Sequence, residues 1–323
     1  MTLKRLCHLI LPVVMLLSAS SALAQSVYPS RAVTLVIPYP AGSSDTIGRM
    51  LATRLSAIWG QPVVVDNKPG ASGITGMMAA KNATPDGYTL VLGLNGPLTA
   101  NPHLFPKLPY DPLSDFVLVA KVVQIPLMIA ASQDFPFSTL AELVVAAKKT
   151  PGKLEFASPG NGTGSHLAAE MFLSRVGANI LHIPYKGTGP AMTDLLAGHV
   201  KLMFTASGDF APHVRAGRIK AIAVTGKARA PQFPNVPAIA ESYAGFEAVG
   251  WAGFLAPANT PPAIVTKISA DLRRVLADPG VINSIVDVGL IADYQDGPDF
   301  RKYVQSEMDA VGKVIKDAKI QIN

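Results

Sequence analysis

The sequence predicts an α/β protein built of two lobes, which are joined by a hinge that the chain crosses twice. Short apolar strands alternate with amphipathic helices through most of the chain, as in α/β folds. A glycine-rich loop lies between a strand and a helix in each half of the sequence. Without its first 24 residues the 323-residue chain keeps 299, a length typical of about two domains.

The first lobe begins with the β-branched run VTLVI at 33–37, which indicates a buried strand. The next segment places apolar side chains at helical spacing over 45–59 and reaches Gly60, a residue that commonly ends helices. We then expect a strand at 62–65, a helix at 70–82 and a strand at 88–94. This βαβαβ order predicts right-handed crossovers and a parallel sheet.

A second unit of the same kind follows Ile125-Pro126. Its expected helices cover 139–149, 164–176 and 189–197, and its expected strands cover 154–157, 180–183, 201–205 and 219–224. Residues 245–257 are expected to be an extended return crossing. Two long amphipathic helices at 261–277 and 297–317, with little strand between them, complete the chain. The expected domains are 25–124 plus 250–323 for lobe 1 and 125–249 for lobe 2.

The N-terminus has the pattern of a secretory signal peptide. Lys4 and Arg5 precede an apolar run, and Ala22-Leu-Ala24 matches an A-x-A cleavage site. The apolar run over 6–17 is shorter than the roughly 20 residues of a spanning helix, although a retained anchor is the alternative. We expect cleavage near Ala24 and a soluble periplasmic product. No cysteine follows that site, which argues against a lipoprotein.

Composition narrows the class of function. The one cysteine, Cys7, lies in the leader, so the mature chain has no disulfide or thiolate metal site. Loss of Lys4 and Arg5 lowers the net charge from +6 to +4, that is 26 basic minus 22 acidic residues. No basic run or basic-aromatic interleaving is present, so nucleic acid is not an expected partner. A mild positive charge fits an anionic small molecule.

The chemistry is expected in two loops, Pro38–Asp45 and Ser158–His166. Each follows a strand and precedes a helix, which is where open α/β sheets bind ligands. Glycines allow backbone N–H groups to approach a ligand, and a helix N-terminus adds unpaired donors. Hydroxyl donors come from Ser43, Ser44, Thr163 and Ser165. Two such loops facing each other suit a dicarboxylate, or a carboxylate with a polar far end.

The same residues have structural interpretations. Ser44, Asp45, Thr163 and Ser165 are also good helix N-caps. Tyr39 and Trp251 fit the lining of a cleft or packing at the hinge equally well. Asp209 could contact a ligand amine or water, or belong to a turn. The glycines at 160, 162 and 164 lack the dinucleotide spacing and no phosphate-binding P-loop is present, so we expect no cofactor.

Signals for catalysis and metal binding are weak. The sequence has no G-x-S-x-G motif. His166 and Glu170 have an i, i+4 spacing compatible with a metal, but such a pair without a third ligand is more often a surface pair. His182 lies within an apolar strand and fits a core histidine better than a base. An α/β hydrolase using Ser165 or Ser44 would need a base that the sequence does not supply. We therefore predict no enzyme and no metal site.

Several motifs together resemble one family, the substrate-binding (Bug) receptors of tripartite tricarboxylate transporters. The resemblance covers nearly all of the mature chain, and the joint order of its motifs makes it specific. These are Tyr28–Arg31, Pro38–Arg49, Asp66–Gly73, Pro85–Leu90, Gly162–Leu167, His182–Gly187, Asp194–Gly198, Ala216–Val224, Val236-Pro237 and Ala256–Pro261.

The resemblance implies a periplasmic-binding-protein-like, or venus flytrap, fold of two Rossmann-like lobes without catalysis. It implies a monomeric receptor that delivers a small carboxylate, such as a di- or tricarboxylate or an aromatic acid, to membrane transporter subunits; partnership with a sensor kinase is the alternative. Loops 39–45 and 160–166 would hold the ligand. The expected binding residues are Tyr39, Ala41, Gly42, Ser43, Ser44, Asp45, Gly162, Thr163, Gly164, Ser165, Thr205 and Asp209.

Two positions depart from the family pattern. The first loop reads Ala41-Gly42-Ser43-Ser44-Asp45 and is one residue shorter than the usual loop with a Gly-Gly pair. Thr205 stands where relatives often carry Asp, so we expect no charged contact from this position to a ligand amine.

Overall fold

A computed structural model of the protein describes residues 28–40, 42–317 and 320. The predicted signal peptide and Ala41 lie outside these residues. Arg31–Asn323 form one compact unit. All elements below belong to it, and they are organised around two separate sheets.

The first sheet has six strands in the order β11-β4-β10-β3-β1-β2. β1 pairs in parallel with both β2 and β3, as the βαβαβ pattern predicts. β10 runs antiparallel between β3 and β4, and β11 runs antiparallel to β4. The strands are β1 (Val33–Ile37), β2 (Val63–Asn67), β3 (Thr89–Leu94), β4 (Phe116–Ile125), β10 (Gly250–Pro257) and β11 (Ile291–Asp296).

The second sheet has five strands in the order β7-β6-β8-β5-β9. β6 pairs in parallel with β7 and β8, whereas β5 runs antiparallel to β8 and β9. The strands are β5 (Leu127–Ser132), β6 (Glu155–Ser158), β7 (Leu181–Pro184), β8 (Leu202–Ala206) and β9 (Ile219–Val224). Both sheets are therefore mixed: the predicted parallel pairing within the βαβαβ unit is confirmed, and antiparallel strands that the sequence did not indicate extend each sheet.

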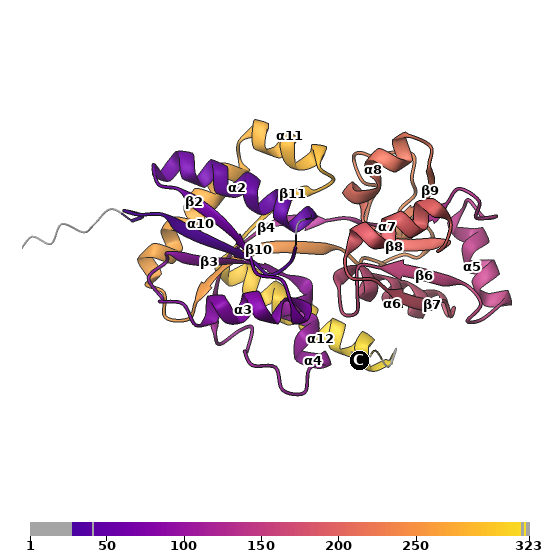
Figure 1. Ribbon diagram of the computed structural model, residues 1–323, viewed down its shortest axis with the longest axis horizontal. Coiled ribbons are helices and arrows are strands. Elements are labelled where there is room, and N and C mark those ends of the chain that lie inside the picture. Colours follow the sequence, from indigo (N-terminus) through magenta and orange to yellow (C-terminus); the bar gives the residue numbers. More distant parts are fainter. Residues whose placement is uncertain (1–27, 41, 318–319, 321–323) are drawn as a thin grey trace, which may run out of the picture. The chain divides into compact units, whose positions relative to one another are not determined.

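Helices cover both faces of the first sheet (Figure 1). On one face α2 and α11 each contact α10, and on the other α12 contacts η4 and α4. These elements are α2 (Ser43–Trp59), η3 (Ala71–Gly73), α3 (Ile74–Lys81), η4 (Gly96–Ala100), α4 (Asn101–Leu104), α10 (Pro262–Leu276), α11 (Pro279–Asp287) and α12 (Gly297–Asp317). The second sheet carries α5 (Leu140–Lys149), α6 (Gly164–Val176), α7 (Thr188–Ala197), α8 (Ser207–Arg215) and α9 (Ile239–Ser242).

The core of the first lobe depends on residues from both ends of the sequence. Trp251 of β10 is fully buried and meets the ring of Phe300 of α12 edge to face, with centroids 5.2 Å apart. Val36 of β1 belongs to the same apolar cluster. Trp251 is thus a packing residue, which settles the choice that the sequence left open between packing and lining a cleft.

The sequence misjudges several elements. Residues 245–257 hold a central strand, β10, and β11 separates the last long helices where little strand was expected. α2 begins at Ser43, two residues earlier than predicted. The expected helix over 70–82 is a short 3-10 turn followed by α3. Strands β4 and β5 and helices α8 and α11 were not predicted.

Candidate functional site

The first loop joins β1 to α2 and ends in a helix start that no side chain caps. Gly42 is the N-cap residue, and its carbonyl accepts the N–H of Thr46 at 2.9 Å. The first N–H groups of a helix have no intrahelical partner, so this turn offers donors to an anion. Ser44 and Asp45 lie inside the helix, because it starts before them, and neither is its N-cap. Nothing is described of Ala41 or of the Ser43 side chain.

The Asp45 carboxylate belongs to a hydrogen-bond network that reaches the backbone of the first loop. Its carboxylate accepts the Nε of Arg49 at 2.9 and 3.1 Å, one helical turn on. Arg49 also donates to the amide oxygen of Asn67 at 2.8 Å, and Asn67 donates to the carbonyl of Tyr39 at 3.1 Å. The bond from Arg49 lowers the pKa of Asp45 below its usual value. Asp45 therefore positions the first loop through Arg49 and Asn67.

The second loop joins β6 to α6, and a threonine caps its helix. The Thr163 hydroxyl accepts the N–H of His166 at 3.3 Å and donates to the carbonyl of Gly160 at 2.8 Å. Gly160 and Gly162 have φ of 147° and 71°, a region that side chains disfavour. Thr163 thus takes the capping role that the sequence offered as an alternative, and Ser165, 7% exposed, lies within the helix.

Two histidines form hydrogen bonds to the second loop. The N–H of Gly162 donates to Nδ1 of His166 at 3.1 Å, and the hydroxyl of Ser158 bonds to Nε2 of His182 at 2.7 Å. The two imidazole rings stack with centroids 3.8 Å apart. Burial, and secondarily the charge of His166, lowers the pKa of His182 to about 3. His182 is a bonded, packed histidine, as the sequence favoured.

The loops of the two lobes approach each other at Asn95 and Gly96, which follow β3. A Cβ on Gly96 would lie 2.7 Å from the Tyr39 hydroxyl and 3.4 Å from the carbonyl oxygen of Gly162. A Cβ on Gly164 would lie 3.7 Å from the side-chain oxygen of Asn95. Sequence reasoning missed Asn95 and Gly96, although their position after a buried parallel strand was a usable signal.

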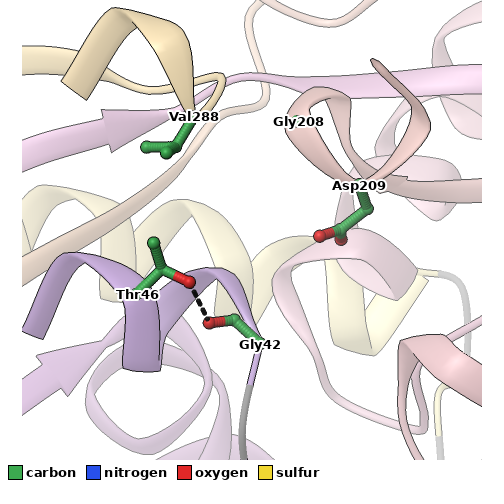
Figure 2. A pocket seen from close by; sticks show the side chains of 5 residues that line it. All are labelled: Gly42, Thr46, Gly208, Asp209 and Val288. Atoms are coloured by element: carbon green, nitrogen blue, oxygen red, sulfur yellow. Dashed lines mark hydrogen bonds between the residues drawn. The ribbon is translucent and has the colours of Figure 1, made fainter. Parts of the chain in front are cut away.

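A cavity of about 310 Å³ opens between the start of α2 and the start of α8. Figure 2 shows Gly42 and Thr46 on one side of it, Asp209 on the other and Val288 above them. Thr205 is 2% exposed and donates to the Asp209 carboxylate at 3.0 Å, so it lies behind Asp209. The structure thus brings Gly42 and Asp209 together. Residues 162–165 are not among the described residues that line this cavity.

The wall of the cavity is closed by a contact between two backbones. A Cβ on Gly208 would lie 2.2 Å from the carbonyl oxygen of Val288, and one on Gly289 would lie 2.4 Å from the Cα of Gly208. These distances require glycine at position 208 unless a backbone shifts. Val288 and Gly289 come from the end of α11, a region that the sequence did not connect with the site.

Comparison with known proteins identifies the family. A family model for the tripartite tricarboxylate transporter family receptor matches residues 47–320, well over half of the 323 residues. The chain belongs to this family. The receptor superposes on a structure of the periplasmic binding protein BugD with a TM-score of 0.82, at 36% identity, covering 91% of this chain and 99% of that one.

Two further structures of relatives contain ligands. R. palustris Rpa4515 with adipate matches the receptor with a TM-score of 0.86 and 31% identity, over 91% of this chain and 99% of that one. MatC of Rhodopseudomonas palustris with bound malate matches with a TM-score of 0.80 and 31% identity, over 89% of this chain and all of that one. The receptor therefore has the two-lobed venus flytrap fold of periplasmic solute-binding proteins.

The receptors of this family are solute-binding proteins rather than enzymes. Among the described residues, neither Ser44 nor Ser165 hydrogen-bonds to a histidine, as a hydrolase nucleophile would. His166 and Glu170 lie 3.7 Å apart, and the described part of the chain holds no cluster of three potential metal ligands. None of its described helices has the length and apolar character to cross a membrane.

Proposed function

We propose that the protein captures a small carboxylate between its two lobes and delivers it to the membrane subunits of a tripartite tricarboxylate-type transporter. The observation that carries the proposal is the meeting of two glycine loops from different sheets at Gly96, within reach of Tyr39 and Gly162. Both loops precede a helix start, the usual place for anion binding. The relatives solved with adipate and malate hold carboxylates.

The hydrogen bonds in the loops indicate which groups would bind the ligand and which would position them. Backbone donors near Gly42 and Gly164 would bind the carboxylate oxygens, with the Tyr39, Ser44 and Ser165 hydroxyls alongside them. Gly162, whose N–H donates to His166, would shape the second loop around the ligand. The carboxylates and hydroxyls already engaged in the loops, at Asp45 and Thr163, would hold these donors in place. A site held together before the ligand arrives loses less entropy on binding.

The proposed domain limits remain 25–124 plus 250–323 for lobe 1 and 125–249 for lobe 2. In support, the first sheet draws its strands only from 33–125 and 250–296, and the second draws its strands from 127–224. We further propose export to the periplasm with cleavage near Ala24, and action as a monomer. N-terminal sequencing of protein recovered from the periplasm tests the cleavage, with Gln25 expected as the first residue.

Calorimetry and thermal unfolding test the ligand class. Protein unfolded and refolded to remove a co-purified ligand would be titrated with mono-, di- and tricarboxylates, aromatic acids and amino acids. A binding carboxylate stabilises the folded state by about 2.7 kcal/mol at a hundredfold excess over Kd. Neutral sugars serve as the control class. Binding of sugars with no response to any carboxylate would show that the ligand assignment is wrong.

Delivery to a transporter needs a separate test. Membranes that contain tripartite tricarboxylate transporter subunits from the same organism should take up the ligand only when loaded receptor is added. If uptake does not depend on the receptor while a sensor domain binds it in a ligand-dependent way, the sensor-kinase alternative replaces transport.

A further inference from the structure

Another cavity, of about 230 Å³, lies where α6, beside the second sheet, contacts α12, beside the first. From α6 it is lined by Gly164, which belongs to the second loop, and by Leu167; from α12 it is lined by Glu307 and Val311. Leu167 and Val311 pack in one apolar cluster. The cavity therefore belongs to the contact between the lobes, and the helix that covers it also carries the end of the second loop.

Both carboxylate oxygens of Glu307 accept hydrogen bonds from the first lobe. Oε1 accepts Nδ2 of Asn95 at 2.7 Å, and Oε2 accepts the indole N–H of Trp251. The side-chain oxygen of Asn95 accepts the backbone N–H of Trp251 at 2.9 Å, which completes a small network. Asn95 and Trp251 belong to the first sheet and its loops, so a separation of the lobes would leave these bonds in place.

The charged and titratable groups around Glu307 also come from the first lobe and from the segment that leads into it. Lys121 of β4 is paired with Asp293 of β11 at 2.6 Å. Tyr303 lies one turn earlier on α12, and Glu247 precedes β10 on the cavity wall. The described residues of α6 that line the cavity are uncharged, namely Gly164, Leu167, Ala168 and Met171. Contact with α6 therefore adds cover to the carboxyl group without adding a counter-charge.

Resting on the proposed function and the proposed domain limits, we infer that closure of the lobes over a ligand buries Glu307 under α6 and so couples ligand binding to the uptake of a proton by its carboxyl group. Two-lobed receptors close around ligands by hinge motion. Opening would take α6 off the cavity and admit water to Glu307. Burial without a counter-charge disfavours the ionised form of a carboxyl group.

Ligand binding should consequently be tighter in acid. Burial is the main cause that raises the pKa of Glu307 to about 7 in this structure, against the opposing bonds from Trp251 and Asn95. In the open form water lowers this pKa towards the ordinary 4.5. Between the two values the closed form holds more protons than the open form, and the closed form binds the ligand. The gain in affinity is therefore full at the acid end and is lost as the pH rises through 7.

Calorimetry tests the coupling directly. Refolded protein would be titrated with adipate and malate, the acids held by the two solved relatives, and with the wider carboxylate panel. Titrations at pH 7 in buffers that differ in their heat of ionisation count the protons taken up on binding, and we expect a fraction of one proton. Between pH 6 and 8.5 the ligand carboxylates stay ionised, and the affinity should fall at least about threefold, since a difference of one pKa unit changes it about tenfold.

Glu307→Gln should abolish both the proton uptake and the fall in affinity, because its amide stays neutral over this pH range. Asp309→Asn is the matched control, since Asp309 is exposed on the same helix and is not among the described residues that line the cavity. It should keep the uptake and the pH profile of the wild type. Circular dichroism of both variants checks that they fold, and the proton count on the wild type does not depend on either variant.

Three results would overturn the inference. These are binding to the wild type without proton uptake, proton uptake that persists in Glu307→Gln, and no binding of any carboxylate in the panel. The first two leave the proposed function standing and show that Glu307 does not report closure. The third removes the proposed function as well.

Discussion

The imidazole rings of His166 and His182 lie face to face beneath the second loop, with their centroids 3.8 Å apart. Each ring bonds to a different part of the loop, His166 to the N–H of Gly162 and His182 to the hydroxyl of Ser158. Nδ1 of His166 must be unprotonated to accept that N–H. The hydrogen bond between Ser158 and His182 thus links the loop to the protonation of His182, which gives a first prediction.

We expect His182 to destabilise the fold in acid. Its pKa is lowered to about 3 from an ordinary 6.5, so between these values the unfolded chain binds a proton that the folded chain does not. This contribution to stability is present above pH 6.5 and is lost as the pH falls towards 3. Denaturant unfolding between pH 7.5 and 4.5 measures how the free energy of unfolding depends on pH. In His182→Gln this dependence should be weaker than in the wild type, by up to about 1.4 kcal/mol per pH unit. A slope in His182→Gln equal to that of the wild type would contradict the assignment.

Glu307 should produce the opposite dependence. Burial raises its pKa to about 7, against the opposing hydrogen bonds from Trp251 and from Asn95 at 2.7 Å. Between the ordinary value of 4.5 and 7 the folded chain holds a proton that the unfolded chain releases, so stability is full below pH 4.5 and falls as the pH rises through 7. Glu307→Gln should lose this fall in unfolding experiments from pH 5 to 8. Asp309→Asn, exposed on the same helix, is the control, and an equal slope in Glu307→Gln and wild type would contradict the assignment.

Gly208→Ala should weaken ligand binding. The added Cβ would lie 2.2 Å from the carbonyl oxygen of Val288, so α8 and the end of α11 must move apart beside the cavity. We expect a loss of about 1–3 kcal/mol in the free energy of unfolding and at least a tenfold loss in affinity for the carboxylate found by calorimetry. Gly189→Ala is a matched control, since nothing lies within 4 Å of its Cβ position. Unchanged affinity in Gly208→Ala would mean that this contact does not shape the site.

Lys121 forms a buried ion pair whose loss should lower the free energy of unfolding more than the loss of an exposed ion pair. It is 1% exposed, lies 2.6 Å from the carboxylate of Asp293 and stands over the ring of Tyr303 at 4.0 Å. Lys121→Met should cost about 3 kcal/mol, the low end for a broken buried pair, because Asp293 keeps its bond from Gln124. The exposed pair of Lys302 with Asp299 provides the comparison, and Lys302→Met should cost far less than Lys121→Met, because water screens exposed charges. Equal losses in the two variants would argue against the buried pair.

Local signals in the sequence were enough to predict the helices and strands next to the binding loops. The apolar run at 33–37 forms β1, and Gly60 ends α2 with a φ of 63°, as a C-terminal glycine should. Thr163 could be named as a cap candidate because capping depends on residues within one turn. The glycine-rich loops were visible for the same reason.

Features that depend on distant partners could not be predicted. β4 contains Lys121, whose buried charge is compensated by Asp293 and by the ring of Tyr303, both far along the chain. The antiparallel direction of β10 follows from the chain's return out of the second lobe, which no local pattern encodes. The contact of Gly208 with Gly289 likewise joins segments that lie far apart in the sequence.

The position of β10 in the middle of the first sheet determines when the first lobe can fold. During synthesis β1, β2 and β3 leave the ribosome long before β10, which lies between β3 and β4 in the sheet. Phe300, which packs in the same core, is made later still. Contacts between residues so far apart in sequence slow folding. Synthesis must therefore reach the last helix, α12, before this lobe can complete its core.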